Sequence, residues 1–167
     1  MSGNTKSLLS LDSLLAAVNG SLAGKARSDF NFAYVVTDSR FVSAGAMFVP
    51  LIGETQNGHK YIPQAIEAGA TVILANKSDY EQNNAFYKEL ELSGKLASVT
   101  LILVENTLYA LQAAAKAYAA KVAGNMIRVS ITGSSGKTTT KEMLVSVCKK
   151  HFGDEAVAYT KGNFNSE

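Results

Sequence analysis

The chain has 167 residues, of which 47% are hydrophobic and 18% are charged, and its formal net charge is +2. This apolar content excludes a disordered chain, and the balanced charge gives no basic surface for nucleic acid or lipid binding. The single cysteine cannot form an internal disulfide, which favours a reducing, cytoplasmic environment. No apolar stretch approaches the roughly 20 residues of a membrane-spanning helix, so we expect no membrane insertion.

Helical and strand-like patterns alternate along the first part of the chain. Ser10 is a suitable N-cap for the first helix, and Gly69 a suitable stop for the second. Pro50 cannot donate to a sheet, so its strand either ends there or lies at an edge. The expected elements in chain order are a helix at 11–18, strands at 34–36 and 47–51, a helix at 61–68, a strand at 71–75 and a helix at 76–94.

The alternation continues to the end of the sequence. We expect a strand at 99–104, a helix at 107–122, a strand at 126–131, a helix at 137–151 and a strand at 156–160. Strands alternating with helices indicate an α/β fold with a parallel or mixed sheet. A faint change of composition suggests a boundary between domains at 1–105 and 106–167. The second domain would hold too few strands for a complete α/β domain, so we expect the sequence to be the front of a longer protein.

A glycine-bearing loop lies between the strand and the helix expected in the second domain. It reads Thr132-Gly133-Ser134-Ser135-Gly136-Lys137-Thr138-Thr139. Its glycines allow tight turns that direct backbone N–H groups at phosphate oxygens, and the helix start adds partial positive charge. Lys137 would contact the β- and γ-phosphates of ATP, and Thr138 would bind Mg²⁺. The general phosphate-loop template has glycine where this chain has Ile131, and the alternative is an ordinary Gly/Ser turn.

The loop and the residues that follow it, 131–143, resemble the Mur ligases, the ATP-dependent amino-acid ligases of peptidoglycan assembly. Lys141-Glu142-Met143 and the segment 160–165 are most similar to the members that join D-alanyl-D-alanine to UDP-N-acetylmuramoyl-tripeptide. By resemblance, Asn163 and Asn165 lie near the muramyl-peptide site; turn formation is the alternative reading of both residues.

The front half of the chain, from Thr37-Asp38-Ser39-Arg40 to Gly58-His59, resembles the uridine-nucleotide-binding domain of the same family. The resemblance implies that Thr37, Ser39 and Arg40 hold the uridine diphosphate end of the substrate, and that Glu54, Thr55 and Gln56 lie beside the uridine. The residues alone leave Arg40 two roles, an ion pair with Asp38 or a contact to phosphate. We expect His59 to be a turn residue rather than a catalyst.

The resemblance implies an α/β protein with a small uridine-nucleotide-binding domain, followed by the truncated start of a P-loop ATPase domain with a parallel sheet and flanking helices. The implied ADP-forming reaction phosphorylates the terminal carboxylate of UDP-N-acetylmuramoyl-tripeptide, and the amine of D-alanyl-D-alanine attacks the acyl phosphate. ATP and Mg²⁺ are the implied cofactors, and we expect a monomer. Catalysis would depend on charge neutralisation and alignment at the γ-phosphate, with Lys137 as an electrostatic clamp.

Three other functions stay open at this point. The chain resembles, less closely, the family member that adds the third peptide residue. It is also compatible with a non-catalytic module that binds a nucleotide sugar, or with a generic P-loop hydrolase. The 167 residues lack the later acidic Mg²⁺ ligand, the modified lysine and the C-terminal domain of the family, so we expect them to be inactive alone.

Overall fold

The computed structural model describes residues 7–122, 124 and 126–160. The chain divides after Gly124 into two compact units. Within the described ranges, none of the helices combines the length and the apolar content needed to cross a lipid bilayer.

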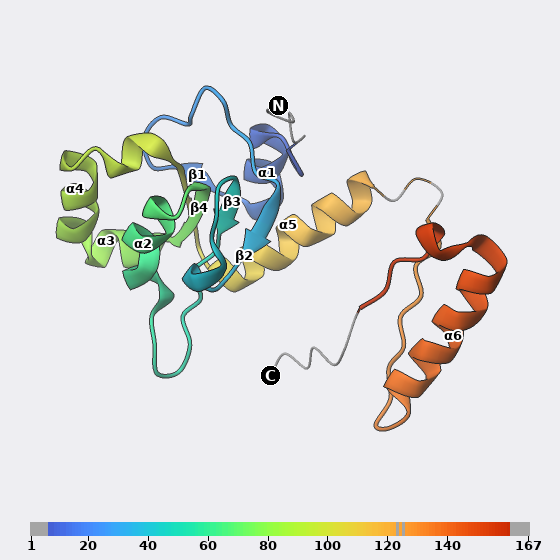
Figure 1. Ribbon diagram of the computed structural model, residues 1–167. Coiled ribbons are helices and arrows are strands. Elements are labelled where there is room, and N and C mark those ends of the chain that lie inside the picture. The colour runs from blue at the N-terminus through green and yellow to red at the C-terminus, as the bar shows by residue number, and fades with distance from the viewer. Residues whose placement is uncertain (1–6, 123, 125, 161–167) are drawn as a thin grey trace. The chain divides into compact units, whose positions relative to one another are not determined.

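A five-stranded sheet forms the centre of the first unit (Figure 1), in the order β1-β5-β4-β3-β2. The strands are β1 (Ser21–Leu22), β2 (Tyr34–Val36), β3 (Ala46–Phe48), β4 (Ala70–Asn76) and β5 (Thr100–Val104). Strands β2 to β5 run parallel to one another, and β1 pairs antiparallel with β5. This mostly parallel sheet with flanking helices confirms the α/β prediction. Strand β3 lies inside the sheet and ends before Pro50. Of the two possibilities expected for that proline, the structure therefore shows the end of a strand and not an edge strand.

The helices follow the predicted pattern, with one correction. They are α1 (Leu11–Val18), α2 (Ile62–Glu67), α3 (Lys77–Gln82), α4 (Asn84–Leu92), α5 (Thr107–Lys121) and α6 (Lys137–Phe152). Ser10 caps α1, since its Oγ accepts a hydrogen bond from the Ser13 N–H at 3.3 Å. The single helix expected at 76–94 is two helices, because Asn83 leaves the helical conformation with φ −105° and ψ 35°.

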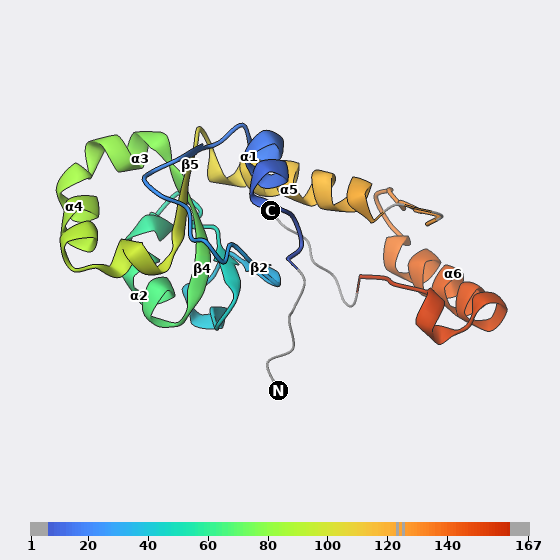
Figure 2. The same ribbon diagram turned by 90° about the horizontal axis from the view of Figure 1, so that it is seen from above.

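Two layers of helices cover the sheet, as Figures 1 and 2 show. Helices α1 and α5 lie on one face, and α2, α3 and α4 lie on the other. Successive side chains of a strand point to opposite faces. Accordingly, Val72 and Leu74 of β4 pack in the α1–α5 core cluster, whereas Ile73 and Ala75 pack in the α2–α4 core cluster. The first unit therefore has two hydrophobic cores that share one sheet.

Helix α5 belongs to the first unit. Its residues Ala110 and Ala114 are buried in the same cluster as Leu14 of α1. The first compact unit therefore extends to Gly124, whereas the pattern of the sequence placed a boundary after residue 105. The assignment of the two units to substrate binding and ATP binding stays a prediction.

The second unit contains α6 and extended segments. The strands predicted at 126–131 and 156–160 are not formed; residues 154–156 instead make a short 3₁₀ turn. Ile127 and Val129 are exposed, at 85% and 62%. A strand needs a neighbour to pair its backbone groups, and the described part of this unit forms no strand that could be one. The apolar pattern alone was therefore insufficient, and these two predictions were wrong.

Candidate functional site

A cleft of about 700 Å³ opens in the first unit where β2 and β3 end. Its lining comes from three segments, which are residues 37–40 after β2, residues 51–58 after β3, and residues 61–64 at the start of α2. In open α/β sheets, ligands bind outside the carboxyl ends of parallel strands. The cleft has that position. The residues that line it are Thr37, Asp38, Ser39, Arg40, Leu51, Gly53, Gln56, Gly58, Tyr61 and Gln64.

Ser39 links the first segment of the cleft to α2. The residue is buried in the short 3₁₀ turn Ser39–Phe41, and its Oγ donates to Gln64 Oε1 at 3.0 Å. A hydroxyl can accept hydrogen bonds as well as donate one. Ser39 is therefore held in place by α2 while its oxygen keeps acceptor capacity beside the cleft.

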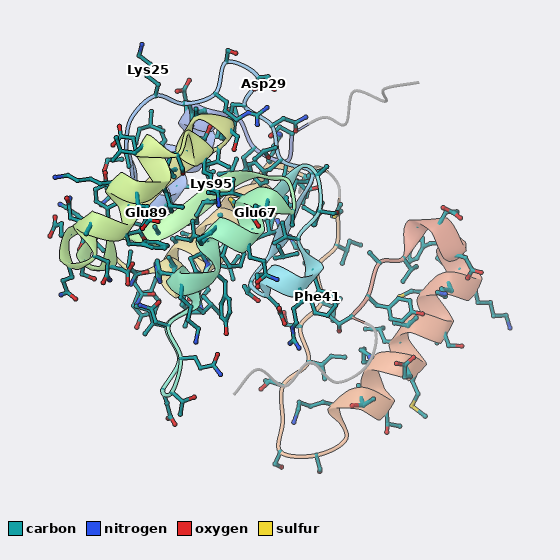
Figure 3. All side chains as sticks on the ribbon, turned by 60° about the vertical axis from the view of Figure 1, so that its left-hand side comes forward. Lys25, Asp29, Phe41, Glu67, Glu89 and Lys95 are labelled. Atoms are coloured by element: carbon teal, nitrogen blue, oxygen red, sulfur yellow. The ribbon has the colours of Figure 1, made fainter. Side chains whose placement is uncertain are left out.

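Asp38 and Arg40 form an ion pair at the edge of the cleft. Asp38 Oδ1 accepts the Arg40 backbone N–H at 3.0 Å, which caps the turn, and the Arg40 guanidinium donates Nη2–H to Oδ2 at 2.6 Å. These bonds lower the pKa of the Asp38 carboxyl to about 2. Of the two roles open to Arg40, the structure contains the ion pair. The Arg40 side chain is nevertheless 78% exposed, and the adjoining Phe41 lies on the surface (Figure 3).

The second segment of the cleft is a narrow loop between Ile52 and Asn57, which pair as an isolated antiparallel bridge. Its Gly53 N–H donates to the Gln56 carbonyl at 2.8 Å. Gln56 lines the cleft, and its Oε1 accepts a hydrogen bond from the Tyr61 hydroxyl at 3.2 Å. The base of the loop is tight because a Cβ at Gly58 would lie 2.8 Å from the Leu51 carbonyl oxygen.

The cleft brings together four of the predicted substrate residues, which are Thr37, Ser39, Arg40 and Gln56. Glu54 and Thr55 lie exposed on the same loop but do not line the cleft. Sequence reasoning missed Tyr61 and Gln64. Their spacing of three residues at the start of a predicted helix places both side chains on one face, and that signal could have identified them.

The glycine-bearing loop of the second unit is accessible throughout, since every residue from Thr132 to Thr140 is exposed. Helix α6 begins at Lys137, and Gly136 is its N-cap with φ 77°, a left-handed conformation that favours glycine. A glycine N-cap has no side chain to satisfy the first N–H groups of the helix. The Lys137 ammonium folds back and donates to the Gly133 carbonyl at 2.6 Å.

These features of the loop fit an anion. The N-terminus of α6 offers backbone N–H groups and partial positive charge, and Lys137 adds a full charge beside them. The described residues contain no group of three or more His, Cys, Asp or Glu side chains that could hold a metal ion. A metal bound at Thr138 would therefore take most of its ligands from phosphate oxygens and water, as Mg²⁺ commonly does. Asn163 and Asn165 lie outside the described residues.

The structure also shows the environments of His59 and Cys148, for which the sequence predicted structural roles. His59 lies in the 3₁₀ turn Gly58–Tyr61, 2% exposed, and does not line the cleft, which agrees with its prediction as a turn residue. Cys148, expected to be a small core residue, is only partly buried on α6. That helix has no buried side chain, so the expectation of a core there was wrong.

A family profile and the sequences of known ligases both match this chain. A family profile described as "Mur ligase family, catalytic domain" matches residues 31–119, which is more than half of the chain and lies within the first unit. The UDP-N-acetylmuramoyl-tripeptide--D-alanyl-D-alanine ligase of Treponema pallidum is 38% identical over 96% of this chain and 33% of its own length. The UDP-N-acetylmuramoyl-L-alanyl-D-glutamate--2,6-diaminopimelate ligase of Chlorobaculum tepidum is 34% identical over 82% of this chain and 25% of its own length.

A solved structure agrees with these relatives. The UDP-N-acetylmuramoylalanyl-D-glutamyl-2,6-diaminopimelate--D-alanyl-D-alanyl ligase of Acinetobacter baumannii superimposes with a TM-score of 0.65 at 27% identity, over 83% of this chain and 27% of the other. The chain thus spans a third or less of the length of the proteins that it matches. It belongs to the Mur ligase family.

Proposed function

We propose that the chain is the N-terminal part of an ADP-forming ligase that joins D-alanyl-D-alanine to UDP-N-acetylmuramoyl-tripeptide through an acyl phosphate. The observation that carries the proposal is the cleft at the carboxyl ends of β2 and β3, whose lining includes Thr37, Ser39, Arg40 and Gln56. The family resemblance assigns Thr37, Ser39 and Arg40 to the uridine diphosphate end of the substrate and Gln56 to the uridine, so the cleft brings together residues that are predicted to bind one ligand. The relative from Treponema pallidum, matched over 96% of this chain, supports the choice of substrates.

Within this proposal, the cleft holds the uridine diphosphate group. The Ser39 hydroxyl and the Thr37 and Gln56 side chains offer hydrogen bonds, with Glu54 and Thr55 beside the uridine on the neighbouring loop. The Arg40 guanidinium has five N–H donors, more than the Asp38 carboxylate engages, so it can contact a phosphate while the ion pair persists. Asn163 and Asn165 are proposed to lie near the muramyl-peptide end.

The second unit is proposed to begin the ATP-binding domain. Gly133, Ser134, Ser135, Gly136 and Thr139 would offer backbone N–H groups to the phosphates. Lys137 would leave the Gly133 carbonyl, 2.6 Å away, and place its ammonium between the β- and γ-phosphates. Thr138 would donate a hydroxyl oxygen to Mg²⁺, which supplies neutralisation of the phosphate charge. Catalysis by the 167 residues alone is not expected.

Two alternatives have observations in their favour. The relative from Chlorobaculum tepidum carries the name of a diaminopimelate-adding ligase, which supports addition of the third residue instead. The first unit has its own core and cleft, which supports a module that binds a nucleotide sugar without catalysis. Phosphate release from ATP by the full-length enzyme separates the two ligases. Release with 2,6-diaminopimelate but not with D-alanyl-D-alanine would overturn our choice.

Calorimetry with UDP tests the cleft itself. We expect saturable binding of UDP to the 167-residue chain, and a loss of affinity of about tenfold for Ser39→Ala or Arg40→Ala. Lys95→Ala is the matched control, because it removes a cation from a surface ion pair with Glu67 at 2.7 Å (Figure 3), and neither residue lines the cleft. No binding of UDP, or equal losses in the control, would contradict the proposal.

A further inference from the structure

The loop between Pro50 and Asn57 is held internally by the Ile52–Asn57 bridge and the Gly53–Gln56 hydrogen bond. It supplies Leu51, Gly53 and Gln56 to the cleft, yet residues 52–56 are all exposed. The conformation of an exposed loop depends on how its two ends are held. Both ends of this loop are held by hydrogen bonds to buried side chains.

The first end is fixed by Thr107, the first residue of α5, which is 2% exposed. The Thr107 hydroxyl donates to the Pro50 carbonyl at 2.7 Å. The Thr107 backbone N–H donates to Asn76 Oδ1 at 3.1 Å, at the end of β4. Pro50 is therefore tied through Thr107 to the carboxyl end of the central strand.

The second end is fixed by His59. The Asn76 backbone N–H donates to His59 Nε2 at 2.9 Å, and His59 Nδ1 lies 2.6 Å from Asn57 Oδ1. A backbone N–H can only donate, so Nε2 must accept and the ring proton must lie on Nδ1, directed at Asn57. A continuous chain of hydrogen bonds thus runs from Pro50 through Thr107, Asn76 and His59 to Asn57.

Asp79 fixes the orientation of the Asn57 amide. Asn57 Nδ2 donates to Asp79 Oδ1 at 2.7 Å. Asp79 also accepts from Asn83 Nδ2 at 3.1 Å and from the Tyr87 hydroxyl at 2.9 Å, and it is 6% exposed. A flipped Asn57 would direct its oxygen at this carboxylate, so only one orientation satisfies both Asp79 and His59.

We propose that His59 is a positioning residue for the cleft. It does not line the cleft; it acts through Asn57 and Asn76, and so sets the loop that carries Leu51, Gly53 and Gln56. This inference rests on the proposed function, because UDP is the probe of the cleft. A purely structural histidine would support stability without affecting the affinity of the folded protein for UDP.

The test measures UDP affinity of the 167-residue chain by calorimetry at a temperature where every variant is folded. His59→Gln can keep the acceptor for Asn76, and His59→Asn can keep the donor for Asn57, so each variant loses one link. We expect each to bind UDP about three- to tenfold more weakly, the effect of one net hydrogen bond. Thr107→Val, which cuts the link to Pro50 without touching the cleft, is expected to do the same.

A double variant and a control sharpen the test. Because His59 and Thr107 belong to one chain of hydrogen bonds, His59→Gln with Thr107→Val should lose no more affinity than the weaker-binding single variant. Ile102 is fully buried in β5 and takes no part in the chain of hydrogen bonds. Ile102→Val therefore removes core volume alone, and this variant should bind UDP as the parent does. Parent-like affinity in the His59 and Thr107 variants, or losses that multiply in the double variant, would overturn the inference.

Nitrogen-15 NMR of the unmodified chain gives a readout that needs no variant to fold. We expect His59 to carry its proton on Nδ1 at neutral pH, and a proton on Nε2 would overturn the inference. If the parent does not bind UDP at all, the proposed function fails, and the inference about the cleft fails with it. If the parent binds UDP and the His59 and Thr107 variants bind it with the same affinity, the proposed function stands and only the inference about His59 fails.

Discussion

The two units of the chain use different sources of stability. In the first, the sheet is covered on both faces and buries two clusters of apolar side chains. In the second, α6 has no buried side chain, and its Met143 and Val147 are exposed at 67% and 66%. Most helical stability in proteins comes from packing of an apolar face rather than from propensity. The cleft of the first unit is therefore supported by a core, whereas the loop before α6 is supported by local interactions.

Hydrogen exchange should give the largest contrast between the units. Amides of β4, whose residues are almost all buried, should exchange only when the first unit opens, with a free energy near that of unfolding. Amides of α6 need only local fraying. We expect protection in β4 to exceed that in α6 by more than about a thousandfold, measured by NMR or mass spectrometry. Equal protection would show that the contrast is wrong.

Core truncation should come next in size. Phe48 of β3 is 1% exposed, so Phe48→Ala should lower the free energy of unfolding of the first unit by about 3–5 kcal/mol. Leu144→Ala on α6, where the side chain is 37% exposed, is the matched control and should change that transition by less than about 0.5 kcal/mol. Urea titration measures both. Similar losses in the two variants would contradict the contrast.

Glycine substitutions should have smaller effects and different causes in the two units. Gly58→Ala places a Cβ 2.8 Å from the Leu51 carbonyl oxygen and should cost about 1–3 kcal/mol and weaken UDP binding. Gly53→Ala is the control for stability in the same loop, since its nearest neighbour is 3.7 Å away. Gly136→Ala meets no atom within 4 Å but has φ 77°, so it should cost about 1–2 kcal/mol from backbone strain alone. A tolerated Gly58→Ala would mean that the loop base can relax.

The smallest effect should be a pH dependence that belongs to the first unit. Burial lowers the pKa of His59, although nearby Asp79 acts in the opposite direction. As the pH falls below about 6.5, the unfolded histidine takes up a proton before the folded one does. The free energy of unfolding should therefore fall with decreasing pH, by at most about 1.4 kcal/mol per pH unit. Urea titrations at several pH values measure this change in the free energy of unfolding. If His59→Gln shows the same dependence on pH as the parent, a group other than His59 causes the effect.

The sequence by itself determined the elements that depend on neighbouring residues. The Ser10 cap, the helical spacing in 11–18 and the buried run in β5 gave elements within a residue or two of the observed ones. The family resemblance assigned residues of the segments 37–40 and 51–58 to one nucleotide, but the local sequence pattern does not show how the fold brings these segments together. The predictions of strands at 126–131 and 156–160 were wrong, because a strand needs pairing partners that a local pattern cannot supply.

Only the tertiary structure decided how the cleft is supported. The hydrogen bonds that hold its loop join residues distant in sequence, since His59 and Asn76 are 17 positions apart and Pro50 and Thr107 are 57 apart. Parallel strands place their carboxyl ends at one edge of the sheet, and this geometry brings β3, β4 and the start of α5 together there. Local periodicity carries no information on such contacts. The role proposed for His59 therefore depends on the tertiary structure and could not be predicted from the sequence.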